Sequence, residues 1–288
     1  MANKLDCEIG FKVDWLRCTL PVETDKMLIA ESHSAFALSD RKLGNMPAYN
    51  RCVAMKCGRL DWHSERPEQR LMLTLTGEDC TRLRAMGGDF RKLIKFLNEM
   101  PGVHFTRIDL AVDLLGGNRK SPQDLYTAVM TKKAQCRAQK HHQILSHSSS
   151  GELIGDTAYI GSRTSETMIR VYDKALETKQ TDVQWVRVEL ELKNRQADAA
   201  TWAIDRAGVE SVTREMLSAF LSGTGVGWYE ALLSDVNADK IVEEPGRKVT
   251  NWEQWLFDIV LPAVEKALRE DVVGVREILE KALSKPVE

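Results

Sequence analysis

Three segments in the middle of the chain alternate charged and aliphatic residues, and this alternation constrains the fold more than any other feature. They cover residues 106–113, 168–174 and 185–193. Because successive side chains of a strand point to opposite faces of a sheet, each segment predicts a strand with one charged and one aliphatic face. The charged faces would carry Arg107, Asp109 and Asp113 on the first strand, Arg170, Tyr172 and Lys174 on the second, and Arg187, Glu189, Glu191 and Lys193 on the third.

The remaining pattern adds further strands and helices around these three. Strands are predicted at residues 13–20, 71–77 and 157–161, and helices at residues 83–97, with a kink near Gly87-Gly88, and from Ser121 to about residue 140. Residues 25–65 have no clear pattern. From Ala197 onward the periodicity is helical, with breaks at residues 223–227 and 243–246. This order predicts an α+β fold, with a largely antiparallel central sheet, flanking helices and an α-helical C-terminal region.

Length and composition suit a globular protein of one or two domains. The chain has 288 residues, of which 43% are hydrophobic and 28% charged. We expect an α+β domain over residues 1–195 and a helical region over residues 196–288, the latter serving DNA recognition or oligomerisation. No apolar stretch is long enough for a membrane span, and the first residues lack the pattern of a signal peptide.

The spacing of the cysteines indicates the cellular compartment, and the distribution of charge indicates where a binding face would lie. The six cysteines have no zinc-ligand spacing, so we expect reduced thiols in a cytoplasmic protein. The net charge of −2 is uninformative by itself. Between residues 119 and 140, however, six basic residues stand against the single acid Asp124. A nucleic-acid face would therefore lie in the middle of the chain, although a solvated helix face also explains a run of charge.

The charged faces of the three strands can be interpreted in two ways. Any one of them could be the solvated face of a one-sided antiparallel sheet. Together, however, they concentrate carboxylates that repel one another unless a cation lies between them, and oxygen clusters of this kind typically hold Mg²⁺ or Mn²⁺. Tyr172 lies between Arg170 and Lys174. Their positive charge is expected to lower the phenol pKa towards that of a nucleophile and to attract a phosphate.

Three blocks of sequence in series resemble a known family. They are Thr106-Arg107-Ile108-Asp109-Leu110-Ala111-Val112-Asp113, then Tyr159-Ile160-Gly161-Ser162-Arg163-Thr164-Ser165 leading into Ile169-Arg170-Val171-Tyr172-Asp173-Lys174, and finally Trp185-Val186-Arg187-Val188-Glu189-Leu190-Glu191-Leu192-Lys193. In order and spacing they resemble the replication initiation factors of staphylococcal-type rolling-circle plasmids and filamentous phages, and related conjugative-element relaxases. The resemblance is strong over residues 71–195. It is weaker at Asp14-Trp15-Leu16 and in a tryptophan-containing helix from Asn251.

The resemblance implies a nicking reaction with Tyr172 as the nucleophile. In that family the tyrosine attacks a phosphodiester of the origin, forming a 5′-phosphotyrosine bond and freeing a 3′-hydroxyl that primes synthesis. The fold is similar to that of nickases whose metal lies on a His-hydrophobe-His strand, but this sequence lacks that motif. His141 and His142 are adjacent and are interpreted as loop or helix residues rather than ligands. The ligands of a divalent Mg²⁺ or Mn²⁺ ion are therefore expected among the acids Asp109, Glu189 and Glu191, with Asp113 as a further candidate.

The remaining site residues would bind DNA. Tyr159 competes with Tyr172 for the nucleophile's role, and otherwise would pack or stack against a base. Phosphate contacts are expected from Arg107, Arg163, Arg187 and Lys193, with Ser165 near the same turn. The tryptophans at positions 202, 228, 252 and 255 are interpreted as core residues of the helical region. Expected partners are single-stranded or hairpin origin DNA, a host helicase and polymerase, and a second copy of the chain in a homodimer.

Three other functions are compatible with the sequence. A DNA-binding regulator could keep the fold without catalysis, although the acidic stripes and the group of Tyr172, Arg170 and Lys174 argue against it. A conjugative relaxase would use the same chemistry. A metal-dependent nuclease that uses water would keep the carboxylates and make Tyr172 dispensable.

Overall fold

The computed structural model describes residues 7–234, except residues 22–23, 25–28, 30–35, 37–38, 40–43, 45, 47, 67, 118–119 and 181. The chain divides into two compact units, Met1–Val242 and Glu243–Glu288, and the described residues all belong to the first. Trp252, Trp255, the expected break at residues 243–246 and the helix expected from Asn251 lie outside the described residues. The predicted division at residue 195 stays a prediction.

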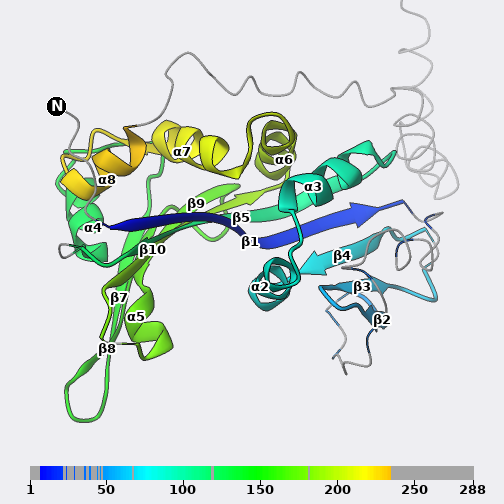
Figure 1. The fold of residues 1–288 in the computed structure, drawn as a ribbon, viewed down its shortest axis with the longest axis horizontal. Helices are drawn as coiled ribbons and strands as arrows, with labels where there is room; N and C mark the ends of the chain where they lie inside the picture. The colour runs from blue at the N-terminus through cyan, green and yellow to red at the C-terminus, as the bar shows by residue number, and fades with distance from the viewer. Residues whose placement is uncertain are drawn as a thin grey trace, which may run out of the picture. The chain divides into compact units, whose positions relative to one another are not determined.

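One large antiparallel sheet organises the described part of the chain (Figure 1). Its strand order is β2-β3-β4-β1-β5-β10-β9-β8-β7, and every neighbouring pair is antiparallel. The predicted fold class is therefore confirmed. The strands are β1 (Glu8–Leu20), β2 (Arg51–Ala54), β3 (Arg59–Trp62), β4 (Leu71–Leu75), β5 (His104–Leu115), β7 (His141–His147), β8 (Leu153–Ile160), β9 (Thr167–Asp173) and β10 (Trp185–Lys193). A separate small ladder joins β6 (Gln135–Cys136) to β11 (Leu221–Ser222).

The helices flank this sheet, and several of them cover its aliphatic face. Their bounds are α2 (Gly77–Ala85), α3 (Phe90–Glu99), α4 (Pro122–Met130), α5 (Lys174–Thr178), α6 (Arg195–Ala207), α7 (Val209–Phe220) and α8 (Gly227–Leu233). Helix α6 packs on β5 and on α3, and α7 packs on β1 and β5. In Figure 1, α3, α6 and α7 lie on one side of the sheet, and α5 lies away from them.

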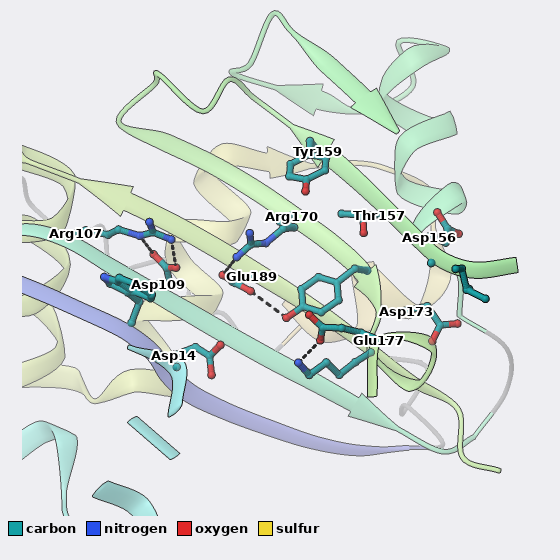
Figure 2. A pocket seen from close by; sticks show the side chains of 16 residues that line it. Asp14, Arg107, Asp109, Asp156, Thr157, Tyr159, Arg170, Asp173, Glu177 and Glu189 are labelled. Carbon is teal, nitrogen blue, oxygen red and sulfur yellow. Dashed lines mark hydrogen bonds and ion pairs between the residues drawn. The ribbon is translucent and has the colours of Figure 1, made fainter. Parts of the chain in front are cut away.

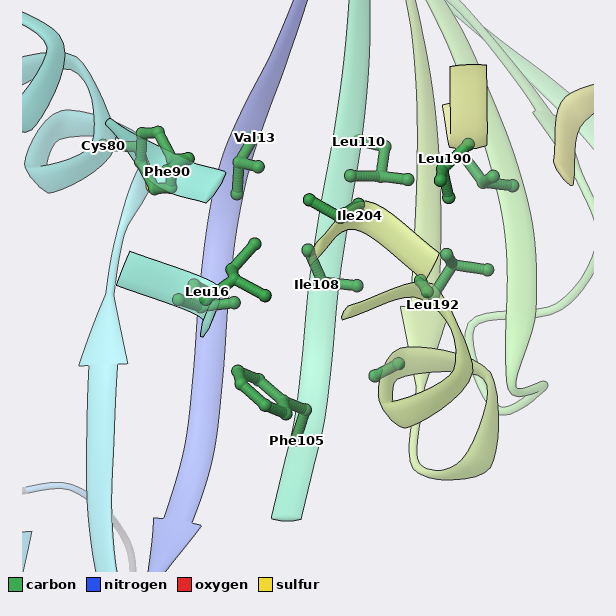
Figure 3. Packing of buried hydrophobic residues seen from close by; sticks show 14 of the residues in the cluster. Val13, Leu16, Cys80, Phe90, Phe105, Ile108, Leu110, Leu190, Leu192 and Ile204 are labelled. Carbon is green, nitrogen blue, oxygen red and sulfur yellow. The ribbon is translucent and has the colours of Figure 1, made fainter. Parts of the chain in front are cut away.

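The core forms where the aliphatic stripes meet these helices (Figure 3). Ile108 and Leu110 of β5 and Leu190 of β10 are fully buried, and Ile204 of α6 packs against the same cluster. Burying such side chains stabilises the fold by roughly 1.5–3 kcal/mol each. Because this face of β5 and β10 is occupied by the core, their charged side chains must point to the opposite face.

Some predicted elements differ from the observed ones. The helix predicted from Ser121 ends at Met130 because Lys132 takes a left-handed φ of 56°, and the chain then returns to the sheet as β7. His141 and His142 therefore lie in an edge strand, not in the loop or helix that we expected. Strands β2 and β3 come from the region without a clear pattern. Strand β9 ends at Asp173, so Lys174 begins helix α5 and does not belong to the charged face of the strand.

Candidate active site

Two rows of side chains cross the charged face of the sheet at right angles to the strands. In one row, Thr157 of β8 is paired with Tyr172 of β9, Tyr172 with Arg187 of β10, and Arg187 with Asp113 of β5. In the next row, Tyr159 is paired with Arg170, and Arg170 with Glu189. Directly opposed residues of antiparallel strands share a face. The register therefore places the predicted charged stripes of β5, β9 and β10 on one face.

A cavity of about 480 Å³ lies over these rows (Figure 2). It brings together residues that are up to 175 positions apart in sequence, from Asp14 to Glu189. Its polar and aromatic lining consists of Asp14, Trp15, Arg107, Asp109, Asp156, Thr157, Tyr159, Arg170, Tyr172, Asp173, Lys174, Glu177 and Glu189.

The hydroxyl of Tyr172 is held at the floor of this cavity. It donates a hydrogen bond to Oε2 of Glu189 at 3.2 Å and accepts one from Nη1 of Arg187 at 3.4 Å. The guanidinium of Arg170 and the ammonium of Lys174 lie 5.8 and 5.5 Å from the ring centroid. Tyr172 is only 8% exposed, so the hydroxyl is fixed in position by its partners.

The surroundings of Tyr172 raise its pKa, contrary to the expected lowering. Burial is the main cause, and the nearby charge of Glu189 adds to it. Arg187 and Arg170 act in the opposite direction but do not outweigh these effects. The sequence showed the two cations flanking the tyrosine but not the depth of burial or the facing carboxylate. Tyr172 is therefore a protonated phenol until a base takes its proton.

Glu189 is the group placed to take that proton. It is almost fully buried and ion-paired with Arg170 through its other oxygen. Burial raises the pKa of Glu189 to about 7, with the charge of Arg170 opposing the rise and those of Asp109 and Asp14 adding to it. A carboxylate with a pKa in this range can both accept and return a proton near neutral pH.

The other predicted acidic residues differ in their surroundings. Asp109 accepts two hydrogen bonds from Arg107, at 2.8 and 2.6 Å, and lines the cavity. Glu191 is ion-paired with Arg107 at 2.9 Å and with Lys193 at 2.7 Å, and it does not line the cavity. The arginines thus hold these carboxylates in the present arrangement. Within the described part of the chain, no three acidic, histidine or cysteine side chains converge closely enough to enclose a cation.

Asp113 is enclosed by hydrogen-bond donors and lies outside the cavity lining. Arg187 binds it through Nε at 2.7 Å and Nη2 at 3.1 Å, Trp185 donates at 2.9 Å, and Lys12 completes the set. Burial alone would raise the pKa of Asp113, but Arg187 and Lys12 together lower it below its usual value. This geometry fits an anchor for Arg187, which in turn contacts Tyr172.

Asp14 is a residue of the cavity that the strand pattern did not assign. Strand β1 has a bulge between Val13, which pairs with Leu110, and Trp15, which pairs with Asp109. The extra residue, Asp14, reaches Arg187 at 3.0 Å. Bulges commonly redirect a side chain in this way. The weak resemblance to the family at residues 14–16 was the only feature of the sequence that pointed to Asp14.

Several buried donors near the cavity lack an acceptor among the described residues. They are Nε1 of Trp15, Nε of Arg17 and Nε of Arg170. The guanidinium carbons of Arg107 and Arg17 lie 4.7 and 5.5 Å from the ring centroid of Trp15. Buried donors normally have partners, so this group suits an acceptor-rich ligand such as a phosphodiester.

Arg163 lies in the turn after β8, and Lys193, the last residue of β10, contacts this turn. Arg163 donates to the hydroxyl of Tyr159 at 3.3 Å and lies 5.2 Å from its ring centroid, and Lys193 donates to the carbonyl of Arg163. Tyr159 has a different environment from Tyr172, because its hydroxyl faces a cation rather than a carboxylate. Its ring is 8% exposed.

Comparisons with known proteins agree with this architecture. Residues 103–224 match the family model described as replication initiation factor, which confirms the resemblance found in the sequence. A solved structure, the rolling circle replication initiator protein from Geobacillus stearothermophilus, superposes with a TM-score of 0.63 and 22% identity. The match covers 75% of this chain and 86% of that one, which shows a shared fold. No curated protein matches this chain. Among the described helices, none is long and apolar enough to cross a membrane.

Proposed function

We propose that this chain, whose residues 103–224 match the replication initiation factor family model, starts rolling-circle DNA replication by nicking one strand of its origin. The observation that carries the proposal is the contact between the hydroxyl of Tyr172 and the carboxylate of Glu189. The cavity around this contact is lined by three cations, Arg107, Arg170 and Lys174, together with several carboxylates. A nucleophile paired with a base and flanked by phosphate-binding groups is the arrangement that covalent strand cleavage needs.

The proposed reaction transfers a phosphodiester from DNA to Tyr172. The Oη atom attacks phosphorus while its proton passes along the existing hydrogen bond to Glu189. The bond between phosphorus and the 3′ oxygen breaks, and that oxygen takes a proton from water and becomes the primer hydroxyl. The products are a 5′-phosphotyrosine and a free 3′-hydroxyl. Arg187 donates to the attacking oxygen and so fixes its direction.

A divalent cation fits the donor chemistry of the cavity. Asp14, Asp109 and Glu189 line it together, and their mutual repulsion contributes to the raised pKa of Glu189. We propose Asp14, Asp109 and Oε1 of Glu189 as ligands of a Mg²⁺ or Mn²⁺ ion, since both prefer carboxylate oxygen. The ion would have to draw these carboxylates closer together than they lie in this structure. Oε2 of Glu189 would remain to take the proton of Tyr172. When bound, such an ion would polarise the scissile phosphate. Glu191 and Asp113, also predicted as ligands, would support the site through Arg107 and Arg187 instead.

The DNA is proposed to be unpaired where it enters the cavity. A phosphate at Tyr172 must approach the floor of a sheet surface, which a flexible single strand or an extruded hairpin does more readily than a stacked duplex. The unpartnered donors of Trp15, Arg17 and Arg170 would bind its oxygens, and Arg163 would bind a neighbouring phosphate. A host helicase and polymerase, and a second copy of the chain, remain part of the proposal as later partners.

The experiment that tests the proposal removes the hydroxyl of one tyrosine at a time. Wild type, Tyr172→Phe and Tyr159→Phe are incubated with Mn²⁺ and labelled single-stranded origin DNA, and covalent adducts are counted after denaturation. Wild type should form an adduct through the 5′ side of the nick and leave a 3′-hydroxyl. Tyr172→Phe should form none, and Tyr159→Phe should retain most of it. Both substitutions keep the ring, so folding should change little.

Other outcomes point to other functions. If Tyr172→Phe still cleaves and no protein-linked product appears, water is the nucleophile and the protein is a hydrolytic nuclease. If only Tyr159→Phe loses the adduct, the nucleophile is Tyr159. If wild type binds the DNA tightly and never cuts it, the chain is a DNA-binding regulator.

A further inference from the structure

The hairpin formed by β7 and β8 exposes an unusual amount of apolar surface. Seven large hydrophobic side chains of the described residues are notably exposed, and four of them lie on these two strands. They are Ile144 (45%), Leu145 (52%), Leu153 (39%) and Ile154 (50%). Single exposed aliphatic residues are common, but four on one hairpin indicate a surface with an occupant.

Strand register connects part of this surface directly to Tyr172. Ile144 is paired with Thr157, and Thr157 is paired with Tyr172. In the next row, His142 is paired with Tyr159, and Tyr159 with Arg170. The side chains of His142 and Ile144 therefore share the face of the sheet that carries the candidate active site. Two strand spacings separate them from β9, which is about 10 Å.

His142 has the geometry of a stacking platform. Its ring lies parallel to that of Tyr159, with centroids 4.5 Å apart and an interplanar angle of 7°. Tyr159 is almost buried, whereas His142 is exposed, so a further flat group can be added only on the side of His142. DNA bases extend such aromatic stacks irrespective of their sequence.

We propose that His142 and Ile144 form a base-binding ledge that holds unpaired nucleotides next to the phosphate bound at Tyr172. This inference rests on the proposed function and adds a subsite for bases to the site for phosphate. The occupant is single-stranded DNA because Tyr159 and Thr157, which pair with the ledge residues, line the cavity of Tyr172. The unpartnered donors of Trp15 and Arg170 in that cavity suit phosphates. Bases would lie on the edge strand while the backbone crosses β8 towards β9.

The neighbouring Leu145 provides a matched control. It is as exposed as Ile144 and lies next to it on β7, but it is paired with Asp156, so its side chain points to the other face of the strand. A general loss of apolar surface or of strand stability would affect both positions. Binding of bases on the active-site face would involve only Ile144.

The experiment compares two ligands that differ only in their bases. Binding of oligothymidylate and of an abasic oligodeoxyribose phosphate of equal length is measured by fluorescence anisotropy without divalent metal, so no strand is cut. Wild type should bind the thymidylate more tightly. The variant His142→Ala/Ile144→Ala should bind it about 10-fold more weakly, a typical effect of losing base contacts, and bind the abasic ligand unchanged. Leu145→Ala should resemble wild type with both ligands.

The possible results distinguish a failure of the base-binding ledge from a failure of the proposed nicking function. If wild type and the double variant bind both ligands alike while wild type still forms the Tyr172 adduct, the ledge is wrong and the nicking function stands. An equal loss with Leu145→Ala would also overturn the ledge. If light scattering shows that the double variant changes oligomeric state instead, the ledge is a contact between copies. If wild type binds neither ligand and forms no adduct, the proposed function itself fails.

Discussion

Arg107 and Arg170 each form an ion pair with one of the carboxylates proposed as metal ligands, Asp109 and Glu189 respectively. Each of these carboxylates has an arginine partner in the cavity, so metal binding competes with an ion pair that is already formed. The positive charge of the arginines also lowers the affinity of the site for a cation. We therefore expect the metal to bind more tightly once a DNA phosphate is present, because the phosphate attracts the arginines away from the carboxylates.

The metal assignment can be tested at a single ligand. Asp109→Asn should weaken Mn²⁺ binding, measured by electron paramagnetic resonance with DNA present, by more than about 10-fold. A chelator should abolish nicking by wild type, and Mn²⁺ should restore it. Glu177→Gln is the control, since Glu177 lines the same cavity but is paired with Lys174 and largely exposed. Equal Mn²⁺ affinity in wild type and Asp109→Asn would remove Asp109 from the ligand set.

The bulge in strand β1 can be removed by deleting one residue, Asp14. The bulge inserts Asp14 between two residues that pair with neighbouring positions of β5, and Arg84 donates to the carbonyl of Val13 at 2.7 Å. Deleting Asp14 would restore regular alternation without changing the register on either side. The free energy of unfolding should therefore fall by only about 1 kcal/mol, the typical value of one hydrogen bond.

The same deletion should affect function far more than folding. It removes a carboxylate from the cavity, so nicking and Mn²⁺ binding should decrease as much as in Asp14→Asn. Chemical denaturation and nicking assays on both variants provide the comparison. A deletion variant that unfolds under native conditions, or that nicks as well as wild type, would contradict this account of the bulge.

The sequence predicted best those strands in which aliphatic and charged residues alternate, because this alternation places the aliphatic side chains on the face that packs into the core. Strands β5, β9 and β10 each pack one aliphatic face into the core, so their alternation revealed the strands and their charged faces. The match to replication initiation factors followed from the same blocks. Strand β7 was missed because, as an edge strand, it buries almost nothing and leaves no apolar period.

Other parts of the candidate site depend on relations between strands that no single segment contains. The position of Asp14 depends on a bulge. The raised pKa of Tyr172 depends first on burial within the sheet and then on Glu189, which lies 17 residues away on the next strand. The enclosure of Asp113 likewise requires Lys12 from β1 and Arg187 from β10. Charge patterns within one strand could not distinguish such an anchor from a metal ligand.

At the scale of the whole molecule, the segment that matches the family model is shorter than the compact unit, which spans Met1–Val242. The match begins at residue 103, yet β1 pairs with β5 along almost its whole length and α3 packs on α6. A fragment of residues 103–234 would expose the edge of β5 and much of the core. It should show no cooperative thermal unfolding by circular dichroism, whereas a chain ending at Val242 should unfold cooperatively. A fragment that unfolds cooperatively would show that β1–β4 are an accessory to an independent domain.

The strand order also has a consequence for motion. Strands β5 and β10 lie inside the sheet, with neighbours on both sides, whereas β7 lies at one edge and has a single neighbour. Backbone amides of β5 and β10 should therefore exchange with deuterium slowly, and those of β7 quickly, because protection follows burial and pairing. In the proposed reaction, the nucleophile Tyr172 and its base Glu189 thus belong to interior strands, β9 and β10. The strand that meets bases of varying size and sequence can adjust without disturbing them.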